Sequence, residues 1–160
     1  MLFRSYIAAE LFKIQISEYI KYCIPVVPFA HAFGRLGCMT VGCCYGCVFR
    51  NPLAITYRGS VLAPNNIPLF PVQLTEAVLL FAISIALLIY INHYKGEHPL
   101  HVYLLTYAAV RFILEFFRYD NAERGIYFKL SSAQYVSIFF LIFASIHLYR
   151  IHRSQCAPGE

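Results

Sequence analysis

The chain has 160 residues, of which 59% are hydrophobic and only 13% are charged, and its mean hydropathy is +0.59. Soluble domains are about half apolar and a quarter charged, so this composition excludes an ordinary soluble domain and favours an integral membrane protein. The formal net charge of +5 suits a protein among anionic lipids, and no stripe of basic and aromatic residues indicates nucleic-acid binding.

The first two segments of the chain differ in their regularity. Residues 1–21 alternate apolar and charged side chains, which predicts a helix lying in the membrane interface. Residues 22–46 are apolar enough to enter the bilayer, but Pro25, Pro28 and several glycines interrupt them. Irregular backbone at membrane depth is tolerated only where it is buried in protein or lines a wet cavity. We therefore expect an interrupted first span whose helix breaks at the glycine-rich run.

The rest of the chain reads as one loop followed by three further spans. Residues 47–72 hold prolines and asparagines and predict the loop, with β-compatible residues at 54–57. The predicted spans are residues 74–92, 100–117 and 133–149. The sequence thus predicts a single all-α membrane domain with about four transmembrane helices. An even number of spans puts both termini on one side, and basic residues near them favour the cytoplasm.

Charged residues inside the predicted spans are informative, because an arginine or acid at mid-bilayer costs roughly 2.5–3.5 kcal/mol on insertion scales. Arg111 and Glu115 are one helical turn apart and Arg118 follows soon after, so all three are expected to project from one face. The pattern fits either a structural ion pair between helices or a functional site. Arg35 favours a functional site. With Arg111 and Arg118 it makes three arginines against Glu115, and the surplus of positive charge suits a phosphate-bearing ligand.

Glycines surround Arg35 and predict a backbone that approaches a ligand closely. Gly34, Gly37, Gly42 and Gly46 can adopt positive φ and offer N–H groups to an anion. Glycines in membrane helices also mark close helix packing, which is the alternative reading. Interleaved with an arginine inside a span, they favour a lipid headgroup site.

The same run contains a cluster of cysteines, Cys38, Cys43, Cys44 and Cys47. Their spacing is not that of a zinc ribbon, whose Cys-x2-Cys pairs are separated by a longer stretch. A zinc or iron–sulfur site, a disulfide involving Cys47, and small apolar filling beside the glycines stay open as alternatives. We predict neither a metal nor a cofactor for this chain.

Four short motifs follow one another along the chain. They are GRLGCMTVGCCYG at residues 34–46, PVQLTE at 71–76, RFILEFFRYD at 111–120 and LSSAQ at 130–134. Together they resemble the signature of the prolipoprotein diacylglyceryl transferase family. The resemblance implies transfer of a diacylglyceryl group from phosphatidylglycerol to a cysteine thiol, such as that of a prolipoprotein, in a bacterial plasma membrane. Members are usually longer, so we expect a truncated member, with a homo-oligomer as one way to regain the missing enclosure.

The resemblance also implies which residues bind the substrates. Arg35 would hold the phosphate of the lipid together with Tyr45 and the glycine run, which consists of Gly34, Gly37, Gly42 and Gly46. Gln73 and Glu76 would position the headgroup or the peptide. Arg118 would add positive potential.

Three residues would carry the chemistry. Arg111 would stabilise the negative charge that builds on the departing glycerol phosphate, and Glu115 would orient the arginines. His31 is the histidine nearest the motif and would be the general base, or else a polar group bonded to a backbone carbonyl. The favoured function is transfer; the alternatives are a non-catalytic phospholipid-binding module or partner subunit, and a metal or redox protein built on the cysteines.

Overall fold

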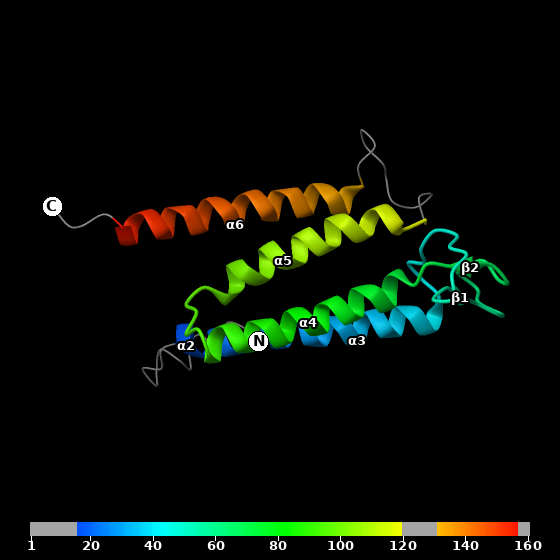
Figure 1. Cartoon of the computed structure of the whole chain (residues 1–160), viewed down its shortest axis with the longest axis horizontal. Coiled ribbons are helices and arrows are strands. Elements are labelled where there is room, and N and C mark those ends of the chain that lie inside the picture. The colour runs from blue at the N-terminus through cyan, green and yellow to red at the C-terminus, as the bar shows by residue number, and fades with distance from the viewer. Residues whose placement is uncertain (1–15, 120–130, 157–160) are drawn as a thin grey trace.

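The computed structural model describes residues 16–119 and 131–156, which form a row of helices with a small loop region at one end (Figure 1). The helices are α2 (Ile16–Cys23), α3 (Val26–Val41), α4 (Val72–Asn92), α5 (Pro99–Leu114) and α6 (Ser132–Cys156), and a 3₁₀ turn, η1 (Glu115–Phe117), extends α5. Within these described ranges, four stretches are long and apolar enough to cross a membrane, and they are Tyr19–Val41, Val72–Asn92, Pro99–Phe117 and Ser132–Ile151. The predicted all-α membrane fold is confirmed. Most of the predicted interfacial helix, residues 1–15, lies outside the described residues.

The first span is bent, as expected, but the bend lies at a different place. Helices α2 and α3 meet at Ile24–Pro25, and the Ser84 hydroxyl on α4 donates a hydrogen bond of 2.8 Å to the Pro25 carbonyl. The predicted break within residues 34–46 lies at Gly42, since α3 continues through Gly34 and Gly37 before it ends. Glycine weakens a helix by only about 1 kcal/mol relative to alanine, whereas proline removes a backbone donor and clashes with the preceding turn.

Helix α3 ends at Gly42, which has the left-handed φ of 79°. Its N–H and that of Cys43 both donate to the Cys38 carbonyl, at 3.0 and 3.2 Å, and so cap the helix. A Cβ at this glycine would lie 2.6 Å from the Ser60 Oγ, so the cap also lets the following loop pack against the helix end. The glycine therefore turns the chain out of the span.

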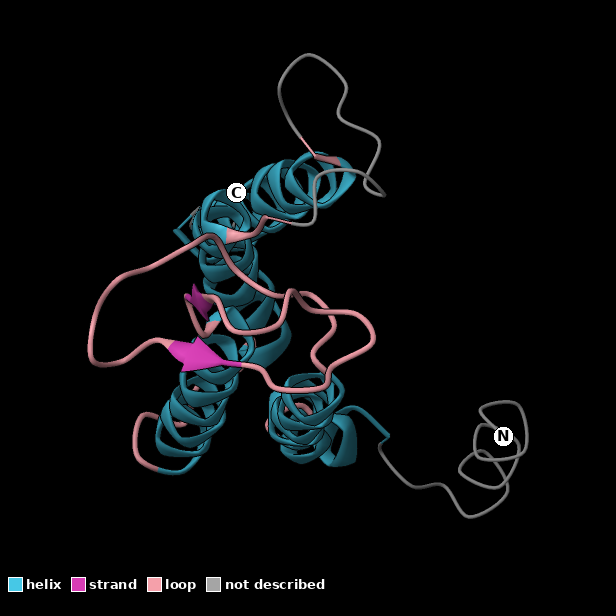
Figure 2. Cartoon of the chain, turned by 90° about the vertical axis from the view of Figure 1, so that its right-hand side faces the viewer, coloured by secondary structure: helices cyan, strands magenta, loops and turns pink. Residues whose placement is uncertain are grey.

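The loop between α3 and α4 is held by a short antiparallel pair, β1 (Ile55–Thr56) and β2 (Pro68–Leu69). Segment 45–48 runs between residues 68–70 and 117–119, since the Cys47 N–H donates to the Phe117 carbonyl at 2.8 Å and its carbonyl accepts from Phe70 at 2.9 Å. The loop therefore joins the start of α4 to the end of α5 (Figure 2). The strand β1 falls within residues 54–57, where the sequence holds β-compatible residues.

The spanning helices pack in chain order, α3 on α4, α4 on α5 and α5 on α6. One small cluster of the buried core consists of Ala32, Ala77 and Leu80, against which Leu36, Phe81 and Tyr107 pack. Most large apolar side chains point outward, Val78 and Phe139 among them. Lipid solvates such side chains as well as protein does, so an outward-facing apolar surface is expected of a membrane bundle.

Candidate active site

A buried carboxylate joins two arginines from different helices near the loop end of the bundle. Glu76 on α4 is 1% exposed, and its Oε1 lies 3.0 Å from Arg35 Nη2 on α3. Its Oε2 lies 3.4 Å from Arg111 Nη1 on α5. Each carboxylate oxygen thus binds a different guanidinium, and three spans meet at one residue.

The ion pairs continue toward the C-terminal end of α5. Arg111 Nη2 lies 3.3 Å from Glu115 Oε2, and Arg118 Nη1 lies 3.8 Å from the same oxygen. Arg35, Glu76, Arg111, Glu115 and Arg118 therefore form one chain of alternating charges, which we call the arginine network. The structure brings together five residues that the sequence placed in the site.

The charge balance of the network differs from the expectation. We expected three arginines to face one acid, but Glu76 is a second buried acid among them. It lies one turn inside α4, which begins at Val72. Three arginines and two glutamates leave a formal surplus of one positive charge. Arg35 Nε is buried and has no hydrogen-bond partner among the described residues, so one donor of the network is unused.

Tyr107 belongs to the site and was not predicted. It lies one turn before Arg111 on α5, and its hydroxyl donates to Glu76 Oε1 at 3.5 Å. The His31 ring packs edge-on against the Tyr107 ring with centroids 5.3 Å apart, which places the predicted base beside the network. The i−4 spacing from Arg111 was the available signal, since residues so spaced share a helix face.

A cavity of about 420 Å³ opens between α5 and α6 beside the network. Its walls are mostly apolar and include Leu104, Val136 and Phe140, with Tyr107 nearer the ion pairs. Arg111 is the single charged residue among those that line it. The cavity thus combines apolar walls with one guanidinium.

The four predicted glycines have different structural roles. Gly34 and Gly37 are helical, and an added Cβ would meet nothing within 4 Å, so close helix packing does not explain them. Gly46 is tightly enclosed, because its Cβ would lie 2.8 Å from Val72 Cγ2 and 3.0 Å from the Phe117 carbonyl. Among the four, positive φ occurs at Gly42.

Gln73 and Tyr45 hold backbone segments together around the site. Gln73 is 2% exposed, and its Nε2 donates to the Cys43 carbonyl at 2.7 Å and to the Tyr57 hydroxyl at 3.4 Å. The Tyr45 carbonyl accepts from the Tyr119 N–H at 3.3 Å. These contacts fix the turn that follows α3 against the start of α4 and the end of α5.

The cysteines of this turn are free thiols. Cys43 Sγ donates to the Cys38 carbonyl at 3.6 Å. Burial, and after it a side-chain hydrogen bond with Cys38, raises the pKa of the Cys43 thiol to about 11. In the described ranges, 16–119 and 131–156, no group of three or more His, Cys, Asp or Glu side chains is arranged to hold a metal ion. Cys43 is therefore a neutral thiol near neutral pH.

Fold and site together define an integral membrane protein that buries an arginine network beside an apolar cavity. The model of the family described as prolipoprotein diacylglyceryl transferase matches residues 1–150. The chain belongs to the prolipoprotein diacylglyceryl transferase family.

Several curated relatives carry the name phosphatidylglycerol–prolipoprotein diacylglyceryl transferase. Transferase 2 of Clostridium perfringens is 36% identical over 88% of this chain and 54% of its own length. The Clostridium tetani relative is 35% identical over 81% of this chain and 51% of its own length, and that of Pasteurella multocida is 29% identical over 96% and 57%. The chain thus spans about half the length of the curated relatives it matches. No solved structure matches it.

Proposed function

We propose that this chain transfers the diacylglyceryl group of phosphatidylglycerol to a cysteine thiol of a lipoprotein precursor, in the plasma membrane of a bacterium. The relatives are bacterial, and their names contain both substrates. The observation that carries the proposal is Arg111, which lines an apolar cavity while two carboxylates hold its guanidinium.

The lipid would bind with its phosphate at Arg111 and hydrocarbon in the cavity. Arg111 Nη1 faces Glu76 and Nη2 faces Glu115, so the plane of the guanidinium is fixed from two sides. A guanidinium has five N–H donors, and two ion pairs leave donors for a phosphate. Leu104, Val136 and Phe140 supply the apolar wall for an acyl chain.

The transfer step then needs a thiolate and a stabilised leaving group. The thiolate sulfur attacks the terminal glyceryl carbon of the diacylglyceryl group, a C–S bond forms, and the C–O bond to phosphorus-bound oxygen breaks. The electron pair leaves on glycerol phosphate, whose charge becomes more negative. Arg111 and the surplus positive charge of the network stabilise that anion as it develops.

The proton of the acceptor thiol requires a destination, because a free cysteine with a pKa of ~8.5 is mostly neutral at pH 7. His31 is the proposed acceptor, since it lies on the same helix as Arg35 and packs against Tyr107. Glu76 is unsuited to the task, because each of its oxygens already binds an arginine.

The glycine run and the residues around it would admit and hold the lipid headgroup. Open space beside Gly34 and Gly37 leaves this face of α3 accessible next to Arg35, whose unused Nε adds a donor. Tyr45 and Gln73 would act through the backbone segments that they join, with Gly46 giving the close approach between them.

A homo-oligomer would add further walls to this open face of α3, and crosslinking in vesicles tests that part of the proposal.

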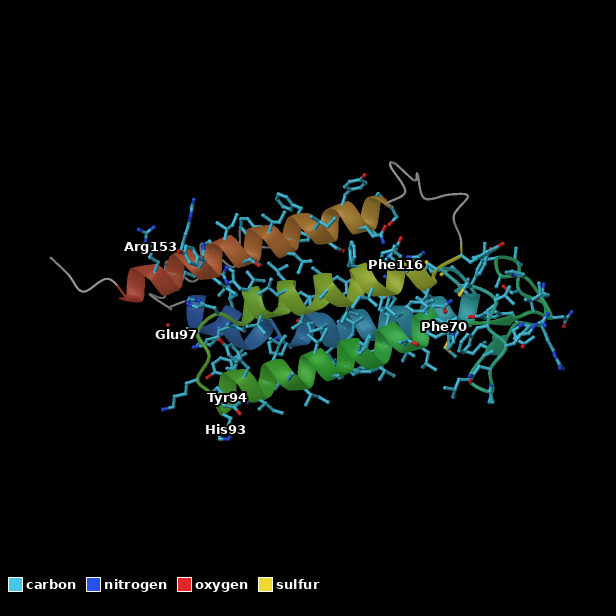
Figure 3. All side chains as sticks on the ribbon, turned by 45° about the horizontal axis from the view of Figure 1, so that its top comes forward. Phe70, His93, Tyr94, Glu97, Phe116 and Arg153 are labelled. Atoms are coloured by element: carbon cyan, nitrogen blue, oxygen red, sulfur yellow. The ribbon has the colours of Figure 1, made fainter. Side chains whose placement is uncertain are left out.

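The test is a transfer reaction with the purified chain in lipid vesicles. Phosphatidylglycerol labelled in its headgroup and a peptide with a lipobox cysteine are supplied, and release of labelled glycerol phosphate is measured. We expect release by the native chain and by Arg153→Ala, an exposed residue at the opposite end of the bundle (Figure 3). Arg35→Ala should abolish it. Release that is equal in Arg35→Ala would contradict the proposal.

A phospholipid-binding module without chemistry is the second candidate. The observation that favours it is the pairing of the network, since Glu76 alone joins three spans and could serve to hold helices together. In the same vesicles, saturable binding of phosphatidylglycerol without release of glycerol phosphate would support the module and reject the transferase.

A further inference from the structure

The loop between α3 and α4 exposes apolar side chains on an ordered turn. Val61 is 96% exposed and Leu62 is 54% exposed, and both lie in residues 60–63, which we call the apolar turn. A nearby turn holds Leu53 with 76% of its surface exposed. Side chains of this kind are unfavourable in water, so a surface that covers them is expected.

Side-chain hydrogen bonds build the apolar turn, so the exposure is not the result of a loose loop. Ser60 Oγ accepts the N–H groups of Leu62 and Ala63 at 3.3 and 3.0 Å. The Asn65 side chain accepts from the Ser60 N–H at 2.8 Å and donates to its carbonyl at 2.9 Å. Val61 and Leu62 are therefore held outward by a defined local structure.

The apolar turn is attached to the point where the first span ends. The Ser60 hydroxyl donates to the carbonyl of Val41, the last residue of α3 and of the span, at 3.3 Å. The end of a spanning helix lies at the boundary between hydrocarbon and headgroups. The loops at this end also extend sideways beyond the outline of the helices (Figure 2). The turn is thus at the depth of the membrane interface.

The charge of the loop indicates which lipids it meets. From Gly42 to Pro71 the charged residues are Arg50 and Arg58, both exposed, and there is no acid. Apolar side chains beside basic ones, at interfacial depth, are the composition of segments that bind anionic membranes.

We propose that the apolar turn inserts Val61 and Leu62 into the headgroup layer of an anionic membrane, while Arg50 and Arg58 contact lipid phosphates. This contact holds the loop at the end of the bundle. Since the loop contains segment 45–48, which joins α4 and α5 beside the arginine network, the contact also keeps that end of the site closed against water. The inference does not require transfer activity.

The absence of tryptophan from the sequence gives a direct test. Val61→Trp introduces the single indole, at a position where the side chain touches little protein. The variant is placed in nanodiscs that contain phosphatidylglycerol or only phosphatidylcholine, and its emission is measured with and without brominated lipid. We expect a blue-shifted emission and strong quenching in the anionic discs, and a hydrated emission in detergent.

The control must separate the effect of the native arginines on lipid binding from the affinity of the introduced indole for lipid. Val61→Trp combined with Arg50→Gln and Arg58→Gln should lose the difference between anionic and neutral discs. A hydrated, unquenched emission in anionic discs would overturn the proposal, and so would equal quenching in both kinds of disc before the arginines are changed. Protection that appears only when a lipobox peptide is added would also overturn it, in favour of a peptide surface.

Discussion

Glu76 joins side chains from two other helices at the centre of the site. Its two oxygens bind Arg35 and Arg111, and Tyr107 donates to it as well. Sequence motifs identified the residue but not its partners, because they lie on α3 and α5, far away in the chain. A carboxylate one turn inside a helix gives no local signal of what faces it.

We expect Glu76→Gln to destabilise the fold. The amide keeps the shape but leaves two half-buried arginines without their shared counter-charge, and breaking a buried ion pair costs about 3–5 kcal/mol. Thermal unfolding in one detergent measures the effect. Glu97→Gln, an exposed acid near the opposite end, is the matched control and should unfold as the native chain does (Figure 3). Equal unfolding temperatures for both variants would contradict the role given to Glu76.

Arg111→Lys should retain the fold and lose activity. Lysine keeps the charge, but a point charge cannot face Glu76, Glu115 and a phosphate together as a planar guanidinium does. Loss of one donor to a developing anion lowers turnover by about 100-fold or more. Glycerol phosphate release and unfolding temperature are measured on the same sample, with Arg153→Lys as the control. Full turnover would remove Arg111 from the mechanism.

Cys43 should resist alkylation near neutral pH. Burial and a side-chain hydrogen bond with Cys38 raise the pKa of its thiol from 9.0 to about 11, so the neutral form persists where an ordinary cysteine ionises. The rate of reaction with a small neutral alkylating reagent follows the thiolate fraction and should rise about tenfold per pH unit until the pH nears that pKa. Peptide mass spectrometry gives the rate at each pH. A rate that levels off below pH 9 would contradict this environment.

At the scale of elements, the sequence predicted where helices occur better than where they bend. Apolar runs gave the spans, because hydrocarbon selects for them directly. The glycine-rich run predicts a break within residues 34–46, yet α3 tolerates Gly34 and Gly37 and ends only at Gly42, and the bend of the span lies at Pro25. Whether a glycine ends a helix depends on the tertiary contacts beside it, and the local sequence does not show these contacts.

Substitution of two glycines tests this distinction. Gly46→Ala should destabilise the protein by about 1–3 kcal/mol, because the new Cβ collides with the backbone of Phe70 and Phe117. Gly34→Ala should be neutral or stabilising by up to about 1 kcal/mol, since it improves helix propensity in open space. Unfolding in the same detergent compares them. A larger loss for Gly34→Ala than for Gly46→Ala would contradict the packing described.

At the scale of the whole molecule, the fold class and much of the site could be predicted, and the cavity could not. Charged residues inside apolar spans are rare, so Arg35, Arg111 and Glu115 were visible in the sequence. The cavity arises from the spacing of α5 and α6, and its walls are ordinary apolar side chains. Such residues look the same in sequence whether they face lipid, protein or a ligand.

We propose that a phospholipid binds at the arginine network and its cavity, and that its diacylglyceryl group is transferred there to a thiol. The most direct measurement is the mass of a lipobox peptide after incubation with the reconstituted chain and phosphatidylglycerol of defined acyl chains. We predict a peptide heavier by one diacylglyceryl group, with a mass that changes when the acyl chains are changed and a product that is absent with Arg111→Lys. An unmodified peptide in the presence of folded native chain would contradict the account.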